Sequence, residues 1–259
     1  MDSDYEQLET VGDRLIPVND DKDNLKSETN SKLWTRQERW MWSLALFLLS
    51  VFNYCCRNAA PLSAISMEQE LDWNKEQTGL VLSSFFWGYT ATQIPAGYCS
   101  DLYGGSQVIT MAAIGWGTIT MSLPGFIYLF PNKSSQLLMV VVHRIVFGAL
   151  QALHYPASIS LLSTRVDPLN KSKVYSMVSS GSSTGVLVSG LIGSYLLSKY
   201  NWHIVFYFFG FCSVTLAVFI RKTLMKKHAA VQIEIVKKGK EKKRKAVPWR
   251  LWFKSKAFC

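Results

Sequence analysis

Hydrophobic residues gather in six runs along this chain, and polar connectors separate the runs. The runs cover residues 40–63, 78–100, 107–130, 137–164, 174–198 and 202–220. Each is close to the roughly 20 residues with which an α-helix crosses the hydrocarbon core of a bilayer. We therefore predict an all-α membrane protein whose residues 40–220 form a bundle of six transmembrane helices. Because the connectors are short, consecutive helices should be antiparallel neighbours.

The fourth run carries a stripe of polar and small residues on an otherwise apolar helix. At about 100° per residue, four positions point within about 40° of one direction: Arg144, Gly148, Gln151 and Tyr155. Such a stripe on a membrane-spanning helix is typical of the wall of a water-filled path. The alternative is an arginine that extends to the membrane interface or forms a structural ion pair. On a neighbouring strip, His143 and His154 are expected to bond neighbouring helices in preference to sensing protons.

A second arginine lies on the first run. Ser50, Asn53 and Arg57 share one helix face, and Arg57 lies roughly 25 Å along the helix from Trp40. Arg144 lies about 10 Å into a helix that enters from the opposite side, so the two guanidiniums should have a similar depth. A charge buried in a membrane requires a partner or water. Since arginine binds phosphate and carboxylate groups through paired hydrogen bonds, we predict that both arginines bind an anion.

The charged residues lie mainly at the ends of the apolar runs. The chain has 28 Lys and Arg against 18 Asp and Glu, which gives a formal net charge of +10. The residues just before the first run and those of segments 165–173 and 221–250 are basic, whereas segment 68–76 is acidic. The positive-inside rule therefore predicts a cytosolic N-terminus and a basic cytosolic central loop at 221–250. This distribution indicates contact with the lipid bilayer and argues against a nucleic-acid partner.

The segments outside the bundle give separate expectations. Residues 1–39 are polar and predict a disordered cytosolic tail. Residues 251–259 are typical of the truncated start of a seventh helix, so a C-terminal half is expected to be missing. Asn132 begins an Asn-Lys-Ser sequon that would face the lumen or exterior and could be glycosylated.

No residue pattern in the sequence indicates an enzyme. The five cysteines lack metal-ligand spacing, and the sequence has neither a recognisable catalytic nucleophile nor a phosphate-cradling glycine loop. We expect no metal ion and no cofactor. Four glycines in the fifth run indicate close helix packing in preference to a ligand site: Gly181, Gly185, Gly190 and Gly193.

The connector after the second run resembles the loop motif of the major facilitator superfamily. The matching residues are Gly97, Asp101, Gly104 and Gly105, while Leu102 stands where the motif has an arginine. The resemblance implies the six-transmembrane-helix N-terminal half of a twelve-helix transporter, with the loop motif acting in conformational change. Asp101 would then cap the next helix or bond the end of a neighbouring helix.

A longer resemblance, from about residue 42 onward, is to the solute carrier 17 family of organic-anion transporters. It rests on DWNKEQTGLVLSSFFWGYTATQIPAG (72–97), GWGTIT (115–120), HRIVFGALQALHYPA (143–157) and VPWRLWFK (247–254). Glutamate-transporting members have a histidine where Leu82 stands and a glutamate where Gln151 stands. The nucleotide-transporting branch is similar to this chain at both positions.

The family resemblance implies potential-driven vesicular uptake of nucleotides such as ATP. The implied substrate-binding residues are Arg57 and Arg144 for the phosphates, Trp87, Tyr89 or Tyr155 for the base, and Asn53 and Gln151 within the same site. Chloride or proton coupling stays open. A secretory vesicle or lysosomal membrane is the implied location, with the plasma membrane as an alternative. Two other readings stay open: a transporter of phosphate, sialic acid or glutamate, and a truncated half-protein that does not transport.

Overall fold

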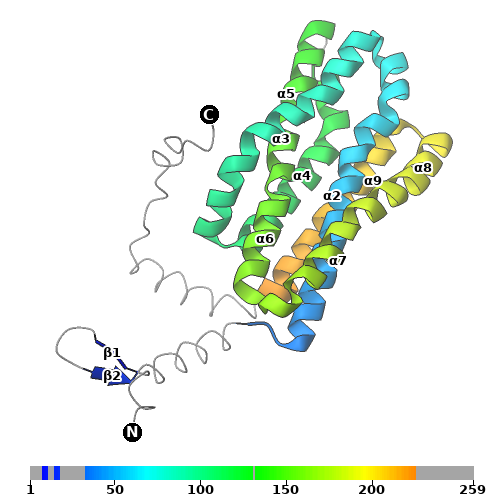
Figure 1. Ribbon diagram of the computed structural model, residues 1–259. Coiled ribbons are helices and arrows are strands. Elements are labelled where there is room, and N and C mark those ends of the chain that lie inside the picture. Colours follow the sequence, from blue (N-terminus) through cyan, green and yellow to red (C-terminus); the bar gives the residue numbers. More distant parts are fainter. Residues whose placement is uncertain (1–7, 11–14, 18–32, 131, 226–259) are drawn as a thin grey trace. The chain divides into compact units, whose positions relative to one another are not determined.

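The computed structural model describes residues 8–10, 15–17, 33–130 and 132–225, and nearly all of them are helical (Figure 1). The long helices are α2 (Arg36–Leu71), α3 (Lys75–Tyr103), α4 (Gly105–Tyr128), α5 (Lys133–Ala152), α6 (His154–Arg165), α7 (Pro168–Val188) and α9 (Trp202–Ile220). Shorter helical pieces are η2 (Ser189–Gly193), α8 (Ser194–Lys199) and η3 (Arg221–Met225). Some of these pieces follow one another directly and form one rod: α5 with α6, and α7 with η2 and α8. Counted in this way, the helices form six rods. These rods correspond to the six predicted runs, so the all-α fold class is confirmed.

The fourth predicted helix is one apolar helical span, Lys133–Arg165, with a single interruption of its regular α-helical turns. The break falls at Leu153, between α5 and α6. Pro156 follows three residues later and has no N–H to donate to the carbonyl of Ala152. The N–H of Leu153 instead bonds the carbonyl of Leu150 at 3.3 Å, a tighter turn than the α-helix. The missing donor of Pro156 thus accounts for the irregular hydrogen bonding at this point.

Most of the other helices differ by a few residues from the predicted runs, and the first also continues to Leu71 where Ser63 was the predicted end. The first helix begins at Arg36, because Thr35 and Glu38 form a reciprocal capping box at its start. The fifth rod begins at Pro168, where the Asp167 side chain accepts a hydrogen bond from the N–H of Leu169 at 2.8 Å. This rod also changes to a π-helix at η2 before it ends in α8.

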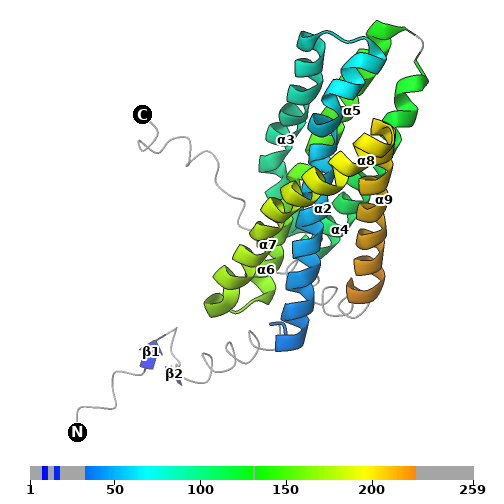
Figure 2. The ribbon, with the colours of Figure 1, turned by 90° about the vertical axis from the view of Figure 1, so that its right-hand side faces the viewer.

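The most extensive helix contacts are those of α3 with α5 and of α2 with α7, and both pairs lie side by side in the two ribbon views (Figures 1 and 2). The α2–α7 contact depends on two of the predicted packing glycines. A Cβ atom on Gly181 would lie 2.6 Å from the carbonyl oxygen of Phe47, and one on Gly185 would lie 2.5 Å from that of Val51. Gly190 has no such neighbour within 4 Å, so close packing is confirmed at only part of the stripe.

The segment before α2 folds back on the end of α6. The N–H of Trp34 donates to the carbonyl of Arg165 at 2.9 Å, and the Trp34 ring stacks on Trp42 with 5.3 Å between ring centres. The starts of α2 and α7 and the end of α6 therefore share one end of the bundle.

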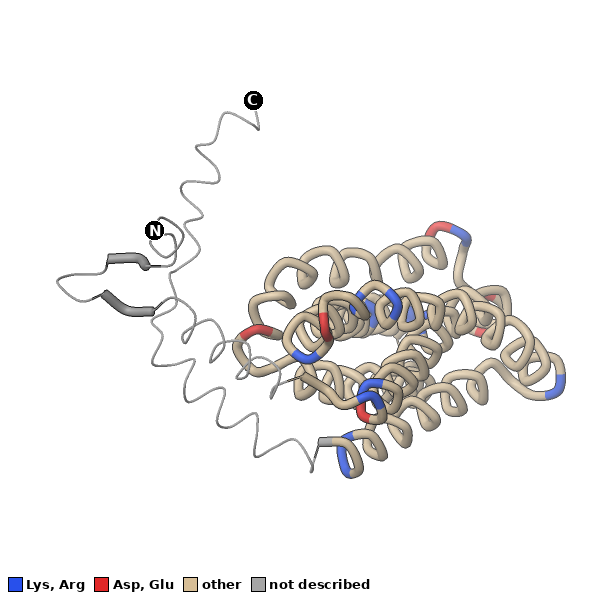
Figure 3. The backbone as a smooth tube through the Cα atoms, turned by 60° about the horizontal axis from the view of Figure 1, so that its bottom comes forward, with Lys and Arg blue, Asp and Glu red and all other residues tan. Residues whose placement is uncertain are grey.

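The surface of the rods is apolar. Many large hydrophobic side chains are exposed, among them Ile94 (78 %) and Leu191 (76 %). Charged residues are sparse along the helices (Figure 3). Three helical segments of the described part are long and apolar enough to cross a bilayer: Gly105–Tyr128, Lys133–Arg165 and Trp202–Leu224. The remaining rods carry more polar side chains. An apolar exterior around a partly polar interior is the arrangement of a membrane protein.

Some predictions concern residues that the structure describes little or not at all. Within the predicted tail, β1 (Leu8–Thr10) and β2 (Leu15–Pro17) pair as an antiparallel hairpin with Glu9 opposite Ile16. The rest of segment 1–32 and residues 226–259, which include most of the predicted basic loop and the start of a seventh helix, lie outside the described residues.

Candidate anion-binding site

Two glycines bring helices α3 and α5 into backbone contact. A Cβ atom on Gly88 would lie 1.9 Å from the carbonyl oxygen of Ile145, and one on Gly148 would lie 2.1 Å from the carbonyl oxygen of Phe85. Both distances are far below van der Waals contact, so neither position accepts a larger residue without moving a helix. The crossing places Phe85 of α3 beside Arg144, which lies one helical turn before Gly148 on α5.

Arg57 of α2 is surrounded by aromatic rings. Its guanidinium carbon lies 4.5 Å from the ring centre of Phe85, 5.3 Å from that of Phe86, 5.4 Å from that of Tyr89 and 5.6 Å from that of Tyr54. All four distances are within cation–π range, where one contact contributes about 0.5–2 kcal/mol depending on solvation. Ring faces hold the cation in place, but they do not neutralise its charge.

The ring of Phe85 also contacts the second predicted arginine. The guanidinium carbon of Arg144 lies 5.3 Å from the ring centre of Phe85 and 5.2 Å from that of Phe147. Arg144 is only 4 % exposed, whereas Arg57 is partly exposed. Two guanidiniums from distant parts of the sequence thus converge on one aromatic side chain.

Neither guanidinium has a carboxylate partner within the part of the chain that the structure describes. The ion pairs found there join Asp72 to Lys133 and Glu70 to His203, near the helix ends. The buried Nε atom of Arg144 also has no hydrogen-bond partner among the described residues. Two like charges held close together in an apolar bundle require an anion or water to compensate them.

Gln151 and Asn53 connect helices α5 and α2, two turns along α5 from Arg144 and one turn along α2 from Arg57. The Nε2 atom of Gln151 donates to the backbone carbonyl of Asn53 at 2.8 Å, and both side chains are buried. Oε1 of Gln151 and Oδ1 of Asn53 lack a hydrogen-bond partner among the described residues. These two oxygens can accept hydrogen bonds from a ligand.

Two of the aromatic residues predicted to contact a base lie near the arginines. Tyr89 touches Arg57 directly. Tyr155 lies near the side chain of Tyr54, which is itself one of the rings around Arg57. Its ring packs edge-on against His154, with 5.1 Å between ring centres.

The third aromatic residue lies elsewhere. Trp87 is 54 % exposed, and its position two residues after Phe85 turns it by about 200° around α3. The structure does not bring it to the arginines. Four further rings contact Arg57 or Arg144 and were not predicted: Tyr54, Phe85, Phe86 and Phe147. The i, i+4 spacing of Phe85 and Tyr89 was the available signal, since it sets both rings on one helix face.

Both histidines of the fourth rod bond neighbouring helices, as predicted. His143 Nε2 lies 3.1 Å from the Ser122 hydroxyl of α4, and His154 Nε2 lies 2.8 Å from the Ser50 hydroxyl of α2.

The residues of the loop motif organise the connection between α3 and α4. Asp101 accepts a hydrogen bond from the Ser160 hydroxyl of α6 at 2.9 Å, which is the predicted bond to a neighbouring helix. The capping position of α4 is Gly104, which has no side chain to form a capping bond. Gly104 has φ 86°, and a Cβ on Gly105 would lie 2.4 Å from a backbone carbonyl of α6. Gly97 has open space around it.

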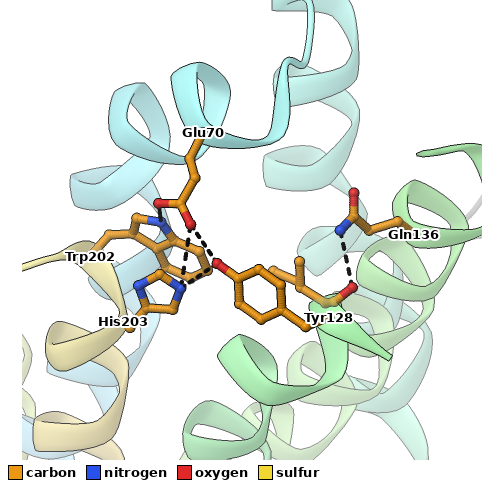
Figure 4. A network of polar contacts seen from close by, with 6 residues as sticks. Glu70, Tyr128, Gln136, Trp202 and His203 are labelled. Atoms are coloured by element: carbon orange, nitrogen blue, oxygen red, sulfur yellow. Dashed lines mark hydrogen bonds and ion pairs between the residues drawn. The ribbon is translucent and has the colours of Figure 1, made fainter. Parts of the chain in front are cut away.

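A polar network joins α2, α4 and α9 (Figure 4). Its α2 residue, Glu70, lies after the end of the predicted first span. The carboxylate of Glu70 accepts hydrogen bonds from the Tyr128 hydroxyl and, at 2.7 Å, from Trp202 Nε1. His203 Nε2 lies 2.8 Å from the same Tyr128 hydroxyl and 3.7 Å from the carboxylate. The hydrogen bond from Tyr128 is the largest cause that holds the pKa of Glu70 below its ordinary value.

The predicted glycosylation position lies near the same helix ends. Asn132 is exposed and precedes α5, and its side chain makes no capping hydrogen bond. The next residue, Lys133, pairs with Asp72, and this hydrogen bond lowers the pKa of the Asp72 carboxyl. Within the described ranges, no group of three or more His, Cys, Asp or Glu side chains could hold a metal ion.

The fold and the site define a class of protein: a bundle of membrane-spanning helices whose interior holds two guanidiniums without a carboxylate partner among the described residues. Residues 46–259 match the family model of the Major Facilitator Superfamily. The chain belongs to this superfamily.

Individual proteins extend the comparison. The chain is 39 % identical to the voltage-gated purine nucleotide uniporter SLC17A9 of Rattus norvegicus over 86 % of its length and 50 % of that protein. It is 37 % identical to the Homo sapiens protein of the same name over 86 % of its length and 51 % of that protein. The chain therefore spans about half the length of these relatives. A bacterial homologue of the human lysosomal transporter Spinster shares the fold, with a TM-score of 0.61, 18 % identity, and coverage of 72 % of this chain and 43 % of that one.

Proposed function

We propose that this chain forms the anion-binding half of a transporter and that its substrate is a nucleotide such as ATP. The observation that carries the proposal is the convergence of Arg57 and Arg144 on Phe85 without a carboxylate partner among the described residues. A polyphosphate supplies the missing negative charge, and each guanidinium can bind phosphate oxygens through two parallel hydrogen bonds.

The neighbouring side chains suit the remainder of a nucleotide. The ring of Tyr89 offers a stacking surface beside Arg57. The unpartnered oxygens of Asn53 and Gln151 can accept hydrogen bonds from an amino or hydroxyl group. The similarity to the rat and human purine nucleotide uniporters favours this substrate over phosphate, sialic acid or glutamate.

Membrane potential is the driving force that we propose. Moving one charge through 100 mV changes its free energy by about 2.3 kcal/mol, so a polyvalent anion is concentrated strongly in an inside-positive compartment. The proposed location is accordingly a secretory vesicle or lysosomal membrane, with a cytosolic N-terminus. A neutral Gln151 in the buried site fits transport without an obligatory proton carrier at that position.

Nucleotide binding to the purified chain in detergent tests the proposal. We expect Arg144→Gln to weaken ATP binding by about tenfold or more, because a charge-assisted hydrogen bond is lost in a buried setting. Arg144→Lys should also weaken it, since an ammonium keeps the charge but not the paired geometry. Lys199→Gln, which removes an exposed charge at the end of α8, is the control and should bind as the unchanged chain does. Unaltered ATP binding by Arg144→Gln would overturn the assignment.

A second pair of variants locates the base. Tyr89→Ala should weaken the binding of ATP more than that of inorganic tripolyphosphate, which has no base. Trp87→Ala, on another face of the same helix, should affect neither ligand. The opposite result would show that the base lies against the exposed face of α3.

A further inference from the structure

A basic groove lies between α2 and α7, at the end of the bundle where both helices begin. It has a volume of about 230 Å³. Arg36, Arg39 and Trp40 line it from α2, and Lys173, Val174 and Met177 line it from α7. We call it the α2–α7 groove. It is separate from the arginines around Phe85, because Arg57 lies about 25 Å along α2 from Trp40.

Helical spacing explains the two-sided lining. Arg36, Arg39 and Trp40 stand at i, i+3 and i+4, and Lys173, Val174 and Met177 stand at i, i+1 and i+4, so each set occupies one helix face. Val174 is buried, whereas Arg36 and Lys173 are exposed. The groove therefore has an apolar inner part and a cationic rim.

Among the described residues, no acidic side chain forms an ion pair with the cations of the rim, which are Arg36, Arg39 and Lys173. Glu38 lies two residues after Arg36, which is about 200° around the axis of α2. Its carboxylate is bonded to Thr35 in the capping box. The carboxylate of Asp167 caps the first turn of α7 by accepting from Leu169 N. Three positive charges thus face one groove.

The position of Trp40 indicates that the groove lies at the level of the lipid headgroups. Its ring is 64 % exposed at the point where the polar segment changes to the apolar first span. Tryptophan side chains favour this level of a membrane, where the apolar hydrocarbon meets the polar headgroups. A volume of about 230 Å³ is below the roughly 300 Å³ at which pockets for drug-sized ligands begin. A phosphate headgroup whose acyl chains extend along the apolar helix faces fits both observations.

We infer that the α2–α7 groove binds the headgroup of an anionic phospholipid. The phosphate and carboxylate groups of the headgroup would contact Arg36, Arg39 and Lys173, while the acyl chains lie against Val174, Met177 and the exposed ring of Trp40. The bound lipid would bridge α2 and α7 at the end opposite to the Glu70 network.

Native mass spectrometry of the delipidated chain, titrated with phosphatidylserine and with phosphatidylcholine, tests this inference. The loss of one cation near an anionic lipid is expected to raise the dissociation constant of the lipid about fivefold. We therefore expect Lys173→Gln to weaken phosphatidylserine binding by about fivefold and the triple change of Arg36, Arg39 and Lys173 to Gln to weaken it by more than tenfold. Phosphatidylcholine should bind weakly to every variant. Equal binding of the two lipids by the unchanged chain would overturn the inference.

Lys171 supplies a matched control on the same helix. It lies two residues from Lys173, about 200° around α7, and lines a different hollow with Ile159, Leu162 and Tyr175. Lys171→Gln should bind phosphatidylserine as the unchanged chain does, and an equal loss in both lysine variants would contradict the assigned position. Lys173→Arg should retain binding, which separates loss of charge from misfolding. Displacement of the lipid by millimolar inorganic phosphate would assign the groove to a free anion and overturn the lipid assignment.

Discussion

Phe85 is the side chain on which the candidate site depends. Its ring is 1 % exposed and lies within cation–π distance of Arg57 on α2 and Arg144 on α5. The only sequence signal for this phenylalanine was its i, i+4 spacing with Tyr89, since its residue type fits an ordinary apolar helix position. The two arginines could be predicted because a guanidinium in a membrane-spanning run is costly. The position of Phe85 between the two guanidiniums could not be predicted, because it depends on how α2 and α5 pack against α3.

Glu70 gives a prediction about pH at the residue scale. Its folded-state pKa lies below the ordinary 4.5, chiefly because Tyr128 donates a hydrogen bond to the carboxylate. The folded state therefore binds this proton less readily than the unfolded state, so the contribution to stability is complete above about pH 4.5 and is lost as the pH falls through the lowered pKa.

Thermal unfolding measured between pH 3 and pH 7 checks this. Glu70→Gln should lower the melting temperature at pH 7 and reduce the loss of stability on acidification. Glu76→Gln, which changes an exposed carboxylate in the first turn of α3, is the control. An unchanged acid dependence in Glu70→Gln would contradict the role of the network.

At the scale of elements, helix crossings decide which residues meet. Gly88 and Gly148 let α3 and α5 touch through their backbones, and Gly181 and Gly185 do the same for α7 on α2. The glycine stripe of the fifth run predicted the second crossing from four-residue spacing. The α3–α5 crossing had only one glycine on each helix at the contact, which is too weak a pattern to recognise. The break at Leu153 was also missed, although Pro156 was visible, because proline positions in membrane helices do not always interrupt them.

Gly148→Ala tests the α3–α5 crossing. The added methyl group would lie 2.1 Å from the carbonyl oxygen of Phe85, so the helices must separate, at a cost of about 1–3 kcal/mol. We expect a lower melting temperature and weaker ATP binding, since separation also moves Phe85 from Arg144. Gly79→Ala is the control, because that position has no neighbour within 4 Å and alanine is the better helix former. Equal stability of the two variants would refute the argument.

At the scale of the whole molecule, the chain spans about half the length of its rat and human relatives. Transporters with two related halves hold their substrate between them and expose it to each side in turn as the halves move. We propose that the described helices form one such half, with Arg57 and Arg144 as its cations. The proposed nucleotide site would be complete only against a second bundle.

Reconstitution of the purified chain into liposomes checks this at the same scale. With an inside-positive potential imposed, we expect ATP to bind the chain but not to accumulate inside the vesicles. Adding a second half, by co-reconstitution with the remaining part of a full-length transporter, is expected to restore uptake. Robust accumulation by the chain alone would contradict the proposal, because it would show that the chain has a complete pathway of its own.

The sequence by itself determined the class of this protein. Apolar runs of membrane length, charges confined to their ends and two arginines in otherwise apolar helices are local features, and each has a direct energetic cause in the bilayer. Only the tertiary structure decided that Arg57 and Arg144 share the ring of Phe85, that Trp87 lies apart from them, and that Arg36, Arg39 and Lys173 line one groove. These facts depend on how closely the helices approach one another and on which face of each helix lies at the contact. Helix crossing is set by packing between side chains far apart in the chain, which periodicity along one helix does not contain.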